Sequence, residues 1–179
     1  MLDSALQALL MSTLEAGLTA RAITGVTVKQ NNQPRQAAVP TGPTVFFSSG
    51  SRKKYGWPQA RDTYDKPSDT LTTTKIQIVH TKFQVAALCP TGAATPYAYT
   101  SSDLVSIASD ILQDEDARVM YVANDCNVFR VNDLPGIWFQ DDKAQNVLWA
   151  SFDIIFTHKD TTTKIVAPIT TFTPKVEII

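Results

Sequence analysis

The sequence has few of the residues that metal sites and disulfide frameworks require. Its only cysteines are Cys89 and Cys126, and its only histidines are His80 and His158. None of the four belongs to a paired-cysteine or H-E-x-x-H spacing. We therefore expect no metal, no cofactor and no disulfide framework, and we interpret the cysteines as reduced.

A surplus of charge of either sign is also missing. The 179 residues include 16 basic and 17 acidic side chains, for a formal net charge of −1. Phosphate binding needs a basic surplus, so nucleic acid is not expected to be the main ligand. The length favours one domain over residues 1–179, and the composition, 44% hydrophobic and 18% charged, is typical of a globular protein.

Long apolar runs are absent as well. Gln7, Ser12 and Glu15 interrupt the leucine-rich start more often than a bilayer span of ~20 residues allows. Asp3 stands where a signal peptide would carry basic residues, so we expect no membrane contact. The leucines instead follow helical spacing, which predicts an amphipathic helix with Gly17 as its stop. They are Leu2, Leu6, Leu9, Leu10, Leu14 and Leu18.

Catalytic motifs are missing too. The chain contains neither phosphate-binding glycine motif, G-x-G-x-x-G or G-x-x-x-x-G-K-[ST], and no G-x-S-x-G elbow. The acidic run from Asp114 to Asp116 lacks the alternating spacing of a calcium loop, and helix capping explains it. We expect no catalytic constellation and hence not an enzyme.

The segments that are present predict an α+β fold. Two short strands follow the first helix, at 26–29 and 43–49. A capped helix at 99–113 precedes a second one at 115–124. Three strands close the chain, at 127–132, 146–158 and 163–171, the last two forming a hairpin around Lys159 and Asp160. In the middle strand an alternating set predicts one core face, namely Leu148, Ala150, Phe152, Ile154 and Phe156.

The stretch "TLTTTKIQIVHTKFQVAALC" predicts one long strand whose apolar residues change phase midway. Ile76 and Ile78 lie on one parity, and Val79, Phe83, Val85 and Ala87 on the other. We expect a β-bulge near 79–81, which would bury both Ile78 and Phe83.

Two segments have no clear place in a core. The lead-in at 29–44 is rich in Gln, Asn and Pro and is predicted to lie outside the sheet. The stretch "SRKKYGWPQARDTYDKPSD" has no periodicity and interleaves basic and aromatic side chains, so we interpret about 51–70 as a loop-like, protein-contact arm that orders on docking. The candidate interface residues are Arg52, Lys53, Lys54, Tyr55, Trp57, Arg61 and Trp138.

The order of these pieces resembles the tail-terminator (neck, or head–tail joining) proteins of tailed bacteriophages. The helix leads to "VTVKQNNQPRQAAVPTGPTVFF", then to a long bent strand and a helix pair. "FRVNDLP" and "ASFDIIF" then follow, within "CNVFRVNDLPGIWFQDDKAQNVLWASFDIIFTHKD". The resemblance is one of segment order and character and covers most of the chain.

This resemblance implies a mixed, mainly antiparallel twisted sheet with helices packed on one face. It implies a ring, most simply a hexamer, in which the arms contact neighbouring subunits. The ring would cap the tail tube in the virion neck, stop tube and sheath polymerisation and join the tail to the head connector. Phage DNA would pass through the lumen without specific binding.

Two other interpretations remain open. One is a head-completion or minor tail protein, which would also assemble as a ring. A small single-strand nucleic-acid-binding module could use the basic and aromatic stretch at 52–66, although its charge surplus of about two is weak.

Overall fold

The computed structural model describes residues 3–30, 42–89, 99–132, 136–140 and 146–166. For residues 136–140 and 146–149 it describes the backbone alone. The elements in these ranges are α1 (Asp3–Ala20), β1 (Thr27–Gln30), β2 (Thr44–Asp65), β3 (Thr70–Leu88), α2 (Ser101–Gln113), α3 (Glu115–Ala123), β4 (Cys126–Val131), β5 (Gly136–Gln140) and β6 (Asn146–Val166).

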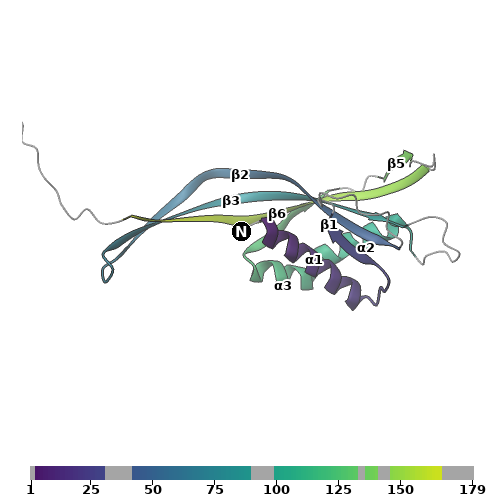
Figure 1. The fold of residues 1–179 in the computed structure, drawn as a ribbon, viewed down its shortest axis with the longest axis horizontal. Helices are drawn as coiled ribbons and strands as arrows, with labels where there is room; N and C mark the ends of the chain where they lie inside the picture. The colour runs from purple at the N-terminus through teal and green to yellow at the C-terminus, as the bar shows by residue number, and fades with distance from the viewer. Residues whose placement is uncertain (1–2, 31–41, 90–98, 133–135, 141–145, 167–179) are drawn as a thin grey trace, which may run out of the picture.

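The strands form one mixed sheet with the order β1-β2-β3-β6-β4, and β5 pairs with the first residues of β6. β1 runs parallel to β2, while the other pairs are antiparallel. The three helices lie on one face of the sheet (Figure 1). This arrangement confirms the predicted α+β class, with a mainly antiparallel sheet and helices on one face.

The core lies between the helices and the middle of the sheet. Alternate residues of β6 are buried there, namely Ala150, Phe152, Ile154 and Phe156, as the alternation predicted. Leu148 belongs to the same predicted face, but its side chain lies outside the described residues. The leucines of α1 cover this face, Leu6, Leu10 and Leu14 being at most 1% exposed. No helix in the described ranges is long and apolar enough to cross a membrane.

The helix pair lies within two residues of the predicted boundaries, and each helix starts at a side-chain cap. The Thr100 hydroxyl accepts a hydrogen bond from the Asp103 N–H at 3.2 Å, and the Thr100 N–H donates to the Asp103 carboxylate at 2.9 Å. Asp114 separates the helices and accepts from the Glu115 N–H at 2.8 Å. The acidic run therefore caps α3.

The prediction that Gly17 ends the first helix is wrong, because α1 continues to Ala20. A Cβ at position 17 would lie 2.2 Å from the Cγ2 atom of Ile111 in α2. Gly17 therefore allows α1 and α2 to pack closely. The residues next to it in the sequence give no sign of this contact.

The predicted hairpin near Lys159 is also wrong, since β6 is one strand of 21 residues. Residues 167–171 of the predicted last strand lie outside the described residues. Likewise, residues 52–65 are not a loop but the outer part of β2, followed by a turn at 66–69. Both errors have one cause. Beyond the helices the strands are wet on both faces, so hydrophobicity there does not alternate.

The predicted bulge in the long strand is not in β3. Its register with β6 is unbroken from Leu71 opposite Val166 to Ala87 opposite Ala150. The irregularities lie on β2, between Ser49 and Arg52 and between Tyr55 and Gln59. Phe83 is buried as expected, but Ile78 is 51% exposed. The change of phase in the sequence of β3 therefore marks the point beyond which the helices no longer cover the sheet.

One strand of the sheet, β5, was not predicted. It pairs residue by residue with β6, from Gly136 opposite Ala150 to Gln140 opposite Asn146. Most of the lead-in, residues 31–41, lies outside the described residues. The prediction that it lies outside the sheet is wrong at both ends, because Lys29 and Gln30 belong to β1 and Thr44 begins β2. At its end, the Pro43 carbonyl accepts a hydrogen bond from the Thr27 N–H at 3.0 Å, next to the parallel pair Thr27 and Thr44.

Candidate interaction surface

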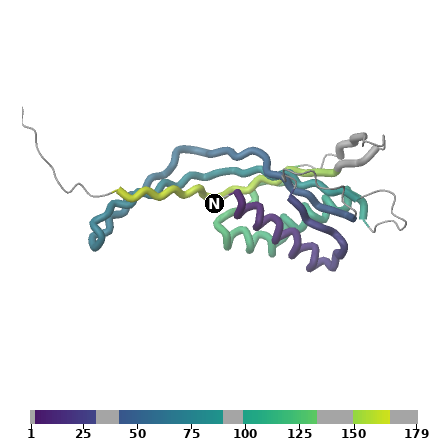
Figure 2. The backbone as a smooth tube through the Cα atoms, viewed as in Figure 1, coloured from purple at the N-terminus to yellow at the C-terminus, as the bar shows by residue number. Residues whose placement is uncertain are grey.

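The three longest strands extend well beyond the helices as a ribbon (Figures 1 and 2). From here on, the arm means residues 51–65 of β2, 70–78 of β3 and 159–166 of β6. In the described residues, β1 pairs with β2 only as far as Phe47, and β4 pairs with β6 only as far as His158. The arm therefore consists of three strands, and its side chains are exposed or half-buried on both faces.

Exposed apolar side chains are concentrated on the arm. The described residues include eleven large hydrophobic side chains that are exposed, and seven of them lie on this ribbon. Trp57 is the extreme case at 96% exposure. The other six are Tyr55, Tyr64, Leu71, Ile78, Ile165 and Val166. Because such residues gather at sites of protein contact, the arm is the candidate interaction surface.

The irregularity between Tyr55 and Gln59 explains the position of Trp57. Gly56 has a φ of +65°, which glycine adopts without strain, and Pro58 cannot donate to a strand ladder. The side-chain amide of Gln77 on β3 donates to the Gly56 carbonyl at 2.6 Å. The extra residues bend β2 and leave the indole in solvent.

Ion pairs connect the base of the arm to the rest of the molecule. Arg52 lies 3.0 Å from the Asp3 carboxylate of α1 and 3.2 Å from Asp160 of β6. Lys54 lies 3.4 Å from the same Asp160 oxygen. These groups are partly exposed, so each pair contributes at most about 1 kcal/mol. Together they favour one orientation of the arm relative to α1.

An aromatic row crosses the arm's base on the sheet face opposite the helices. The ring of His80 lies 4.2 Å from that of Tyr55 and 4.5 Å from that of Phe129, between centroids. The Lys53 ammonium lies 5.4 Å from the Tyr55 centroid, within cation–π range. Phe129 is 61% exposed, so part of this row also faces solvent.

Six of the seven predicted interface residues lie together on β2, from Arg52 to Arg61. They divide between the two faces: Arg52 and Lys54 lie on the helix side, whereas Lys53, Tyr55 and Arg61 lie on the other. The seventh, Trp138, lies in β5 opposite Leu148, and its side chain is outside what the structure describes. Sequence reasoning missed Asp160 and Phe129, because only strand pairing brings them to this site.

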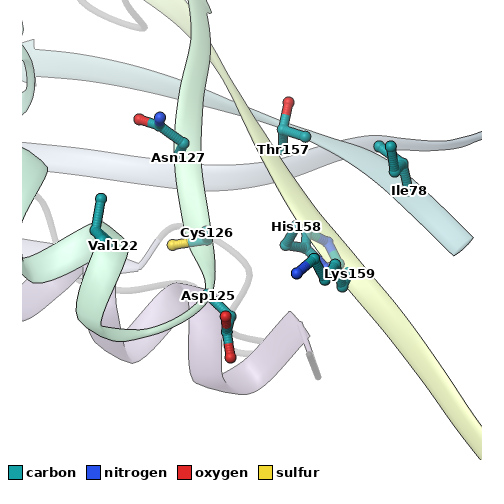
Figure 3. Close-up of a pocket in the computed structure, with 8 residues that line it drawn as sticks. All are labelled: Ile78, Val122, Asp125, Cys126, Asn127, Thr157, His158 and Lys159. Atoms are coloured by element: carbon teal, nitrogen blue, oxygen red, sulfur yellow. The ribbon is translucent and has the colours of Figure 1, made fainter. Parts of the chain in front are cut away.

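A pocket of about 300 Å³ lies where β4 and β6 meet the end of α3 (Figure 3). His158 is buried there, with its Nε2 atom 2.9 Å from the Thr81 hydroxyl, and burial lowers the pKa of this histidine. Burial raises the pKa of Cys126 to about 11, and its sulfur is directed away from the histidine ring (Figure 3). A protonated thiol and a neutral imidazole oriented in this way do not form an activated nucleophile and base. In the ranges described, no group of three or more His, Cys, Asp or Glu residues could hold a metal ion.

Comparison with known proteins complements this geometry. A search of curated proteins gave no match. A family model described as "E217 gateway protein gp29" matches residues 5–167, which include every described element except the first two residues of α1. Since that match spans most of the chain, the protein belongs to this family of bacteriophage head–tail gateway proteins.

Proposed function

We propose that this protein is a ring-forming subunit of the phage neck that terminates the tail and joins it to the head connector. Membership of the gateway family supports a structural role in joining head and tail. The observation that carries the finer proposal is the arm, a long ribbon with exposed aromatic side chains and no core of its own.

Sheets become stable when an apolar face is covered, and this ribbon has neither face covered in the described residues. Its length and side chains suit contact with another subunit. In a ring, each subunit meets the next through two different surfaces, so an element that projects from the body reaches its neighbour. Ring closure would also protect strand edges that otherwise promote aggregation.

In this proposal the ring, most simply a hexamer, caps the tail tube and stops the addition of tube and sheath subunits. Its other side faces the head-completion or connector protein. DNA passes through the lumen without specific binding, consistent with a net charge of −1. No catalysis is assigned to the protein, and its place is the virion neck.

The test is a phage in which this coding sequence is interrupted. We expect DNA-filled heads that are not joined to tails, together with tails longer than normal, both visible by electron microscopy. Supplying the wild-type protein in trans should restore joined virions. Unjoined tails of normal length would support joining without termination, which is the role of a head-completion protein. Joined virions with normal tails would contradict the proposal entirely.

One observation favours a second candidate, single-strand nucleic-acid binding. The row of Tyr55, His80 and Phe129 with Lys53 beside it combines stacking rings with a cation, as stacking platforms do. Such binding would weaken steeply with salt. If fluorescence anisotropy detects no salt-dependent binding of labelled oligonucleotides, this candidate is eliminated.

A further inference from the structure

Within the described residues, the outer arm has two open strand edges at the same level. Six consecutive rows join the three strands, from Gln59–Ile76–Thr161 to Tyr64–Leu71–Val166. β2 forms one edge of these rows and β6 forms the other. Within the described part of the chain, neither of these edges has a further strand beside it.

These edges are suited to pairing. Native proteins usually interrupt exposed edges with prolines or bulges. Here Pro58 and both register shifts of β2 lie before residue 59, and β6 pairs with β3 without a shift. Residues 59–65 and 161–166 are all exposed. Unpaired N–H and C=O groups along six regular rows form a template for another strand.

The strand directions determine which partner fits. β2 and β6 are both antiparallel to β3, so they run parallel to each other on opposite edges of the ribbon. When two copies of the chain lie side by side in the same orientation, β6 of one copy meets β2 of the next as a parallel pair. The same contact can then repeat from copy to copy, which is the requirement for a closed ring.

The side chains on the two edges are complementary in this arrangement. Asp62 and Lys164 occupy one row, on either side of Thr73. With rows at the same level, Lys164 of one copy would stand beside Asp62 of the next. Asp62 accepts a hydrogen bond from the Thr73 hydroxyl at 2.7 Å, and neither charged group has an ion-pair partner in the described residues.

The remaining rows contain no repulsive pair. Val166 would lie beside Tyr64 of the next copy, giving contact between an aliphatic and an aromatic side chain. The other neighbours are Thr161 with Gln59, Thr162 with Ala60, Thr163 with Arg61 and Ile165 with Thr63. No like charges oppose each other in this register.

We propose that copies of this chain assemble by edge-to-edge pairing of their arms, β6 residues 161–166 of one copy adding to β2 residues 59–64 of the next. The partner surface is therefore a second copy of the same protein. The inference rests on the proposed ring and specifies the contact that closes it. It makes the arm part of a sheet that continues from subunit to subunit.

The test uses two charge reversals, Asp62→Lys and Lys164→Asp, in the full chain. Each places like charges together in every contact of a homogeneous ring, so each variant alone should lose assembly. In an equimolar mixture, the unchanged Lys164 of the first variant faces the unchanged Asp62 of the second. At the alternate contacts the two introduced side chains, which are also of opposite charge, face each other. The mixture should therefore restore rings with alternating subunits, measured by light scattering and negative-stain microscopy.

A matched control is Lys75→Asp, which reverses a charge on the same face but on the central strand β3. It should assemble as the wild type does, and thermal melts should show that all three variants fold. A direct check is Asp62→Cys combined with Lys164→Cys, which should give a ladder of cross-linked subunits under oxidation.

Any other outcome of these experiments contradicts edge-to-edge pairing of the arms. Assembly of both single variants as in wild type, or failure of the mixture to recover, excludes this pairing. Loss of assembly in one variant but not the other indicates a two-fold contact that uses only one edge. A wild-type chain that stays monomeric at high concentration overturns edge pairing as well. The phage interruption experiment remains independent, because heads and tails can fail to join whichever contact closes the ring.

Discussion

At the scale of single residues, the contribution of a strand side chain to stability depends on whether the helices cover it. Phe83 and Ile78 lie five positions apart on one strand, yet Phe83 is fully buried and Ile78 is 51% exposed. The Phe83 ring also meets the Phe156 ring edge-on, with 5.9 Å between centroids. An aromatic side chain enclosed in this way contributes far more to stability than an aliphatic one on the open ribbon.

The first prediction follows from this difference. Replacing Phe83 with Ala should lower the free energy of unfolding by about 3–5 kcal/mol, because it leaves a cavity in a packed core. Ile78→Ala, the matched control on the same strand, should cost less than about 1 kcal/mol in the isolated subunit. Urea unfolding of both variants measures this. If both substitutions lower the free energy of unfolding equally, the assignment of Phe83 to the core and of Ile78 to the open ribbon is wrong.

A second prediction concerns His158, which burial keeps in the neutral form. Its folded-state pKa is lowered from the ordinary 6.5, so the unfolded chain binds the proton more readily. The stability associated with His158 is therefore fully present above pH 6.5 and falls as the pH drops toward the folded-state pKa, by at most about 1.4 kcal/mol per pH unit. His158→Gln should flatten the stability profile below about pH 6.5. The measurement is the free energy of unfolding from urea titrations at several pH values. If its pH dependence is the same in the variant and the wild type, groups other than His158 cause that dependence.

At the scale of elements, one glycine sets how closely two helices approach. Gly17 of α1 faces the side chain of Ile111 in α2 with no space for a Cβ. The two helices pack side by side over the sheet (Figure 1). The buried leucines of α1 and the buried residues of α2 belong to one core cluster with the strands, so the spacing of the two helices affects the packing of the whole core.

A third prediction tests this contact. Gly17→Ala should destabilise the protein by about 1–3 kcal/mol, although alanine is the better helix former, because the new methyl overlaps Ile111. Combining it with Ile111→Ala should remove the overlap, so that the double variant is less destabilised than the sum of the two single variants. Thermal and urea melts of the three variants provide the comparison. If the two single-variant losses of stability simply add in the double variant, the helices accommodate the new methyl group by moving apart, and residues 17 and 111 are not coupled.

At the scale of the whole molecule, a near-zero net charge conceals two regions of opposite sign. The three helices carry six acidic residues and one basic residue: Asp3, Glu15, Asp103, Asp110, Glu115 and Asp116 with Arg118. The arm carries seven basic and three acidic residues: Arg52, Lys53, Lys54, Arg61, Lys75, Lys159 and Lys164 with Asp62, Asp65 and Asp160. The net charge therefore says little about the arm by itself, which is why the oligonucleotide test is needed.

The fourth prediction separates folding from recognition. Trp57→Ala should leave the melting temperature nearly unchanged, because the indole is 96% exposed. The same variant supplied to the interrupted phage should fail to restore joined virions with normal tails. Arg52 is less suitable for this purpose, since its ion pairs with Asp3 and Asp160 connect the arm to the body. Full complementation by Trp57→Ala would move recognition to another part of the molecule.

Sequence patterns were sufficient to predict the local features of this protein. Periodicity and capping residues identified the first helix and the helix pair, including the boundary at Asp114, because side-chain spacing and backbone hydrogen bonds act within a few residues. The alternation in "ASFDIIF" likewise identified the buried face of β6. Only tertiary contacts show where the helices stop covering the sheet and how far β2 and β6 continue. They also account for the close approach at Gly17 and for the two arm edges that are open within the described residues. These depend on which distant segments lie together, and a strand that is wet on both faces has no hydrophobic pattern from which to predict it.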